Sequence, residues 1–101
     1  MNELRREFLD EARGKVEEMD TTLTGLETAE IVERLAYLAH QLKGSGGSYG
    51  YQSISEDAAE IEKAAETLPA TNGTHAAISQ KIREHVGNLK AEIDRATAEL
   101  A

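Results

Sequence analysis

Apolar residues recur every three or four positions in four separate segments of this chain. That spacing places them on one face of a helix, because an α-helix turns once in about 3.6 residues. No stretch alternates apolar and polar residues for long enough to indicate a β-strand. The pattern predicts an all-α fold, an antiparallel up-down-up-down four-helix bundle. The expected core positions are, segment by segment, Leu4, Phe8, Ala12, Val16, Met19, Leu23 and Leu26; Ile31, Leu35, Leu38, Leu42 and Tyr49; Ile54, Ala58, Ile61, Ala65 and Leu68; and Ile78, Ile82, Val86, Leu89, Ile93, Ala96 and Leu100.

Polar residues predict where three of the helices begin. Asn2 and Thr28 are residue types whose side chains cap free backbone N–H groups at a helix start. Ser53 stands three residues before Glu56, which is the spacing of a capping box. We therefore expect helices to start at or beside Asn2, Thr28 and Ser53.

Glycine and proline predict where the first three helices end. Gly25 and Gly50 stand at the ends of the first and second apolar patterns, and glycine readily adopts the left-handed conformation of a helix terminus. Pro69 follows the third pattern and cannot continue a helix. The fourth pattern runs to Leu100.

Length and charge restrict the class of protein. A chain of 101 residues is expected to form a single domain over residues 1–101. Its net charge of −8 disfavours nucleic acid and an anionic membrane as partners, because both bind clustered cations. There is no cysteine, no apolar signal sequence at the N-terminus and no apolar run long enough to span a bilayer. We expect a cytoplasmic monomer, either free-standing or excised from a larger protein.

One part of the second helix differs from the rest of the chain. Between Leu35 and Ser55 the only formally charged residue is Lys43, although charged residues make up 30% of the chain. The same stretch holds four of the eight glycines, and each glycine inside a helix costs about 0.8–1.0 kcal/mol against alanine.

The helical repeat indicates what this glycine-rich stretch surrounds. His40 points away from the core face of its helix, and Gly44, Gly47 and Lys43 lie on its side. An uncharged surface without side chains around one nucleophile suits the approach of a second protein.

This segment closely resembles the signature of histidine-containing phosphotransfer domains. In that signature a histidine is followed by an apolar residue at the second position, lysine at the third and glycine at the fourth, as in His40, Leu42, Lys43 and Gly44. Small residues follow, then an aromatic or aliphatic residue and a glycine, as in residues 45–50. The resemblance covers the whole four-helix pattern.

The resemblance implies a phosphoryl carrier. His40 would accept a phosphoryl group from an aspartate of one receiver domain and pass it to another. Lys43 would stabilise charge on the phosphoryl oxygens. Gln41, Gly44, Gly47 and Ser48 would form the docking surface. The partners would be receiver domains, which bring the Mg²⁺, with a histidine kinase as an alternative donor. No cofactor is expected on this chain.

Glu62 is the residue expected to orient His40. The second and third helices form a hairpin that turns near Tyr51, and His40 and Glu62 each lie eleven residues from that turn, at about the same height. A carboxylate at Nδ1–H would leave Nε2 free to attack phosphorus. The resemblance supports this role, since at twenty-two residues after the histidine the domains of hybrid kinases often have glutamine and chemotaxis kinases have glutamate.

Other chemistry is not indicated. No G-x-x-x-x-G-K loop for ATP and no histidine pair at metal-ligand spacing occurs. His85 is expected at the edge of the core, and His75 is expected in solvent.

Two alternatives stay open. The chain could be the N-terminal phosphotransfer domain of a chemotaxis-type kinase, which residues 8–12 resemble, although Ala59 stands where that group often has a second histidine. It could also be a non-catalytic bundle that binds a receiver, but such a bundle needs neither His40 nor Lys43.

Overall fold

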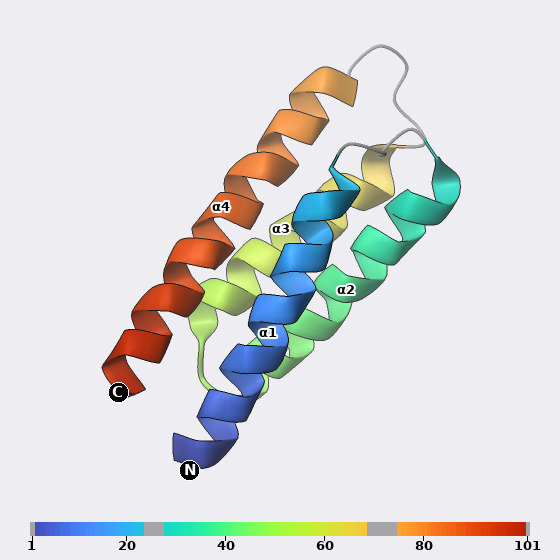
Figure 1. Cartoon of the computed structure of the whole chain (residues 1–101). Coiled ribbons are helices and arrows are strands. Elements are labelled where there is room, and N and C mark those ends of the chain that lie inside the picture. Colours follow the sequence, from blue (N-terminus) through green and yellow to red (C-terminus); the bar gives the residue numbers. More distant parts are fainter. Residues whose placement is uncertain (1, 24–27, 69–74, 101) are drawn as a thin grey trace.

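Four antiparallel helices form one elongated bundle in the computed structural model, which describes residues 2–23, 28–68 and 75–100. They are α1 (Asn2–Thr22), α2 (Ala29–Ser48), α3 (Gln52–Thr67) and α4 (His75–Leu100). Each helix packs against its neighbour in sequence, and α4 closes the bundle against α1 (Figure 1). The bundle measures 45 × 19 × 19 Å. The predicted all-α four-helix fold is confirmed, and no described helix is long and apolar enough to cross a membrane.

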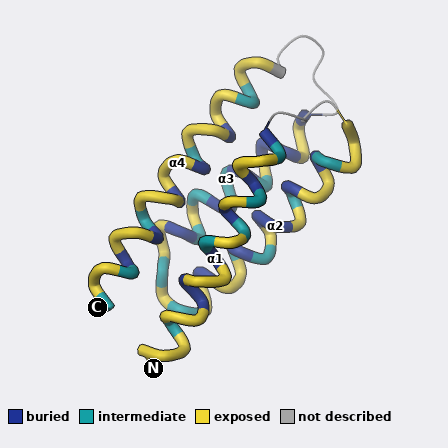
Figure 2. Tube along the Cα trace, in the orientation of Figure 1, coloured by how far each residue is buried: buried dark blue, intermediate teal, exposed yellow. Residues whose placement is uncertain are grey.

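The predicted apolar faces supply most of the core. Buried residues follow the inner side of every helix (Figure 2). Ile31, Tyr49, Ile78 and Leu100 are only partly buried at its margins, and Leu26 lies outside the described residues. The core also takes in four residues that the pattern omitted, because the buried face of a packed helix is wider than one residue per turn. These additional residues are Leu9, Val32, Ala39 and Ala64.

Leu4 was wrongly assigned to the core. Its side chain is 51% exposed, in the first turns of α1 at the end of the bundle where both chain termini lie (Figure 1). At that end Arg6 Nη2 donates a hydrogen bond to the carbonyl oxygen of Leu100 at 3.2 Å. Fewer side chains surround a residue at the tip of a bundle than at its centre. Leu4 therefore continues the apolar period of α1 but is not buried.

The helix starts agree only in part with the predictions. Thr28 caps α2, with its hydroxyl accepting a hydrogen bond from the Ile31 amide at 3.4 Å. Asn2 is the first residue of α1 itself. Gly25 and Pro69, expected at helix ends, lie outside the described residues.

The capping box predicted for Ser53 and Glu56 is wrong. Helix α3 begins one residue earlier, at Gln52, and Tyr51 occupies the N-cap without a side-chain hydrogen bond to the helix. The Tyr51 carbonyl oxygen accepts from the Ser55 amide at 3.0 Å. The packing of Tyr51, whose ring stacks on Phe8 at 5.6 Å between centroids, overrides the local capping signal.

Two glycines shape the junction of α2 and α3. Gly50 has φ +84°, a left-handed conformation that glycine adopts without strain. At Gly46 an added Cβ would lie 3.2 Å from the Ser55 amide nitrogen, so glycine lets the two helices approach closely. Ser55 Oγ also donates to the Lys43 carbonyl oxygen at 2.8 Å. These contacts hold α2 and α3 in a fixed register along their length.

Candidate functional site

His40 projects from α2 into solvent. Leu38, Ala39 and Leu42 around it are buried in the core, whereas the His40 side chain is 66% exposed. The helical repeat turns His40 outward when its neighbours face inward. An exposed imidazole is accessible to another macromolecule.

The register of the hairpin brings Glu62 of α3 to His40. Glu62 Oε2 lies 2.8 Å from His40 Nδ1, and Glu62 Oε1 lies 3.1 Å from Lys43 Nζ. One carboxylate therefore contacts both His40 and Lys43. The Glu62 side chain is only 18% exposed, so this bridge sits in the groove between the helices.

The ionisation of Glu62 determines which imidazole nitrogen is free. Burial raises the pKa of Glu62, but hydrogen bonds from Lys43 and His40 outweigh that effect and leave the pKa below its ordinary value. The carboxylate is thus charged at neutral pH and can only accept hydrogen bonds. Nδ1 of His40 must then carry the proton, and in the neutral ring Nε2 keeps its lone pair.

A shallow hollow lies beside His40 between α2 and α1. Three of the four predicted docking residues line it, namely Gln41, Gly44 and Ser48. A Cβ added at Gly44 would meet nothing within 4 Å, so this part of the surface is open.

Gly47 lies apart from this hollow. It is exposed, but an added Cβ would be 3.7 Å from Ser55 Oγ, on the α3 side of the helix. The structure therefore does not place Gly47 with the other three docking residues around the hollow.

Helix α1 contributes two residues that the sequence analysis missed. Glu11 and Lys15 line the same hollow as His40. They stand four residues apart, each directly before a core residue, Ala12 and Val16, so a search of the polar positions that flank the core face of α1 could have found them. Lys15 adds a second cation to this side of the bundle.

His85 belongs to a separate polar cluster between α3 and α4. Its side chain is 20% exposed, and its Nδ1 lies 2.7 Å from Asp57 Oδ1, which also accepts from Asn88 Nδ2 at 3.3 Å. Burial raises the Asp57 pKa, but hydrogen bonds from Glu92, His85 and Asn88 outweigh it and lower the pKa.

Glu92 completes this cluster as a proton-holding group. Burial, then the hydrogen bond to Asp57 and the charge of Asp57, raise the pKa of Glu92 to about 7. Its Oε1 is buried without a hydrogen-bond partner among the described residues. Those described residues also hold no group of three or more His, Cys, Asp or Glu that could bind a metal ion.

The raised pKa of Glu92 predicts a pH-dependent stability. Folded Glu92 keeps its proton up to about pH 7, whereas the unfolded group loses it near 4.5, so its contribution to stability falls as pH rises between these values. Glu92→Gln stays neutral at every pH. We expect the variant to match the native chain at pH 5 and to be about 1–2 kcal/mol more stable at pH 8, since partial solvent contact reduces the full effect.

Urea unfolding followed by circular dichroism at both pH values measures this difference. The matched control is Glu84→Gln, at an exposed position of α4. An equal change for Glu92→Gln at pH 5 and pH 8 would contradict the prediction.

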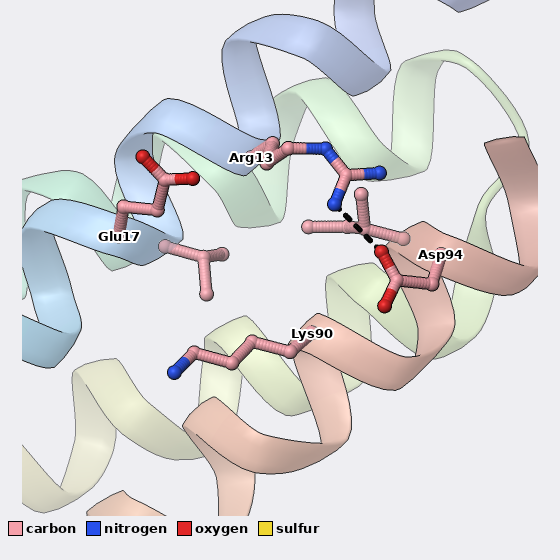
Figure 3. Close-up of a pocket in the computed structure, with 6 residues that line it drawn as sticks. Arg13, Glu17, Lys90 and Asp94 are labelled. Atoms are coloured by element: carbon pink, nitrogen blue, oxygen red, sulfur yellow. Dashed lines mark hydrogen bonds and ion pairs between the residues drawn. The ribbon is translucent and has the colours of Figure 1, made fainter.

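A groove between α1 and α4 has no part in the His40 site. Arg13, Glu17, Lys90 and Asp94 surround it (Figure 3), and Val16 and Ile93 also line it. Arg13 Nη1 and Asp94 Oδ1 form an ion pair across it at 2.6 Å. His40, Lys43 and Glu62 lie on α2 and α3 instead.

Comparison with known proteins identifies the family. The family model of the Hpt domain matches residues 3–99. No curated protein and no solved structure matches the chain. The match extends over all four helices and includes His40, Lys43 and Glu62. The chain therefore belongs to the Hpt family, the histidine-containing phosphotransfer domains.

Proposed function

We propose that this chain is a phosphoryl carrier that exchanges a phosphoryl group between His40 and the aspartate of receiver domains. Membership of the Hpt family implies a phosphotransfer role in a phosphorelay. The observation that carries the proposal for His40 is its contact with Glu62, which holds Nδ1–H at 2.8 Å and leaves Nε2 free in solvent.

The proposed transfer forms one bond to phosphorus and breaks another. The Nε2 lone pair of His40 attacks phosphorus, the bond from phosphorus to the aspartyl oxygen breaks, and the aspartate leaves as a carboxylate. The ring keeps the Nδ1 proton and gains positive charge, which the Glu62 carboxylate stabilises across the 2.8 Å hydrogen bond. The same step in reverse passes the phosphoryl group from His40 to the aspartate of a second receiver.

Lys43 supplies positive charge beside the reacting nitrogen. Its Nζ lies 3.1 Å from Glu62 Oε1. Its side chain is 42% exposed, so the ammonium group has room to reach a phosphoryl oxygen. Stabilisation of charge on the equatorial oxygens is a large part of phosphoryl-transfer catalysis. The Mg²⁺ of the reaction comes with the receiver domain.

The docking surface in this proposal surrounds His40. Gln41, Gly44 and Ser48 of α2 would meet the receiver, with Gly47 at its α3 margin. We further propose that the domain acts in the cytoplasm as a monomer without an ATP site of its own, and that it binds neither nucleic acid nor membranes.

Incubation with receiver domains tests the proposed function. A panel of receivers is phosphorylated on aspartate with radiolabelled acetyl phosphate and mixed with this chain. We expect label that is stable to base and labile to acid, the behaviour of phosphohistidine. Absence of label with every receiver of the panel would contradict the proposal, and binding without label would identify a non-catalytic receiver-binding bundle.

Glutamate at position 62 favours a second candidate, the phosphotransfer domain of a chemotaxis-type kinase. Such a domain receives its phosphoryl group from ATP through a kinase domain. Extension of the gene beyond Leu100 into dimerisation and ATP-binding domains would decide for this candidate. Label transferred from ATP by those domains would be the biochemical sign.

The contact between Glu62 and His40 predicts a graded effect of substitutions. Glu62→Ala removes both the acceptor and the charge, and charge-assisted hydrogen bonds are worth about 1.5–3 kcal/mol. We expect the rate of labelling to fall about tenfold in Glu62→Ala. Glu62→Gln keeps an acceptor for Nδ1–H and should lose less.

The control for this series is Glu60→Ala on the same helix. The Glu60 side chain is 42% exposed, and its ion-pair partner is Lys63 at 3.9 Å, not a site residue. Its labelling rate should equal that of the native chain. Equal rates for Glu62→Ala and Glu60→Ala would show that Glu62 does not orient His40.

A further inference from the structure

Tyr37 is an exposed aromatic residue close to His40. Its side chain is 52% exposed, and among the described residues only Leu4 is a comparably exposed large hydrophobic. Tyr37 stands three residues before His40 and four before Gln41, so the three side chains share one face of α2. Tyr37 takes no part in the transfer step proposed for His40.

Polar neighbours hold the Tyr37 ring in place although it faces solvent. Gln41 Nε2 donates a hydrogen bond to the Tyr37 hydroxyl at 2.8 Å. Arg34 Cζ lies 5.6 Å from the ring centroid, within the range of a cation–π interaction. The ring is thus contacted on its face and at its hydroxyl.

Helix α1 fixes the arginine in turn. Arg34 Nε and Nη2 donate to the two carboxylate oxygens of Glu18 at 2.6 and 3.0 Å, in a bidentate pair. The pair raises the pKa of Arg34 and lowers that of Glu18 through this hydrogen bonding. The guanidinium charge is therefore matched by a carboxylate, and the patch of Glu18, Arg34 and Tyr37 presents a neutral aromatic surface.

This patch is continuous with the His40 site through Gln41. Gln41 lines the hollow beside His40 and also binds the Tyr37 hydroxyl. A partner that brings its reacting group to His40 has to cover the neighbouring turns of the same helix face. Its contact with Tyr37 would be apolar, because no unmatched charge of the patch attracts an ion.

We propose that Tyr37, held by Arg34 and Gln41, anchors the receiver domain during docking and helps to select which receiver binds. The partner it fits is a receiver with an apolar surface beside its phosphorylated aspartate. Tyrosine and arginine are enriched among the residues that dominate binding energy, and a ring held before binding loses little conformational freedom on association. The inference rests on the proposed phosphotransfer function.

Steady-state transfer kinetics test the anchor, with a second receiver in excess to remove the phosphoryl group from His40 so that the chain turns over. The donor is the receiver that labels the native chain fastest, and its concentration is varied. We expect Tyr37→Ala to raise KM about tenfold with little change in kcat, since the anchor contributes to docking and not to the attack by Nε2. Tyr37→Phe, which keeps the ring, should retain most of the affinity.

Controls separate this inference from the proposed function. Leu4→Ala removes a side chain of similar exposure at the end of the bundle and should leave both constants unchanged. If no receiver labels the native chain, the phosphotransfer proposal fails. If receivers label the native chain and Tyr37→Ala equally well, only the anchor is refuted.

Two further outcomes would also overturn the anchor. A fall in kcat without a change in KM would place Tyr37 in the chemical step. Light scattering that shows a native dimer, dissociated by Tyr37→Ala, would assign the aromatic surface to a second copy of this chain. A monomer in both proteins, together with the KM effect, supports the receiver.

Discussion

His40→Gln is expected to abolish labelling by phosphorylated receiver domains. Glutamine has no ring nitrogen with a lone pair for the attack on phosphorus, so no residual rate is expected from this position. The side chain is 66% exposed, and a glutamine amide can still donate to Glu62. We therefore expect the free energy of unfolding to change by no more than about 0.5 kcal/mol.

The matched control is the half-buried histidine of the bundle. His85 also has a carboxylate at Nδ1, but its side chain is only 20% exposed and lies between α3 and α4. His85→Gln should keep full labelling, although its bond to Asp57 contributes to stability. Label that persists in His40→Gln and disappears in His85→Gln would move the phosphorylated residue to His85. Unfolding curves for both variants show whether either effect comes from loss of the fold.

Helical periodicity in the sequence predicted the four helices of the bundle. Four apolar patterns locate four helices, because burial of a continuous face dominates the packing of a bundle. The pairing of His40 with Glu62 could be foreseen for a related reason. A helical hairpin keeps its register over eleven residues on each side of the turn, and here Gly50 forms the turn while Gly46 lets the two helices approach closely.

Features that depend on contacts between other helices were not accessible in this way. The cluster of Asp57, His85 and Glu92 requires the register of α3 against α4, which the apolar pattern of the two helices does not give. Lys15 reaches the hollow beside His40 only through the packing of α1 against α2. The local capping signal also failed at Ser53, where Tyr51, whose ring stacks on Phe8, occupies the N-cap of α3 instead.

Gly44→Leu is expected to block transfer while leaving the fold at least as stable. Leucine is favoured over glycine in a helix by most of a kcal/mol, and a Cβ at this position meets nothing within 4 Å. The added side chain would stand in the hollow next to His40, on the proposed docking surface. We expect transfer to fall by about two orders of magnitude, equivalent to about 2.7 kcal/mol.

The control Gly87→Leu has the same gain in helix propensity. Gly87 is exposed on α4, and a Cβ there also meets nothing within 4 Å. Both variants should melt at or above the temperature of the native chain, but Gly87→Leu should transfer at the native rate. Helix α4 packs against α1 and α3, so it lies across the bundle from α2. Leucine at position 87 is therefore far from the approach to His40.

A small phosphodonor separates obstruction of docking from damage to the nucleophile. Phosphoramidate needs no protein surface, so it should phosphorylate His40 in Gly44→Leu at nearly the native rate. Loss of labelling with both donors would mean that leucine disturbs the imidazole or its bond to Glu62, which is 2.8 Å long in the native chain. Undiminished transfer from receivers would mean that they approach His40 from the α3 side. In that case Gly47, next to Ser55, would be the glycine that faces the partner.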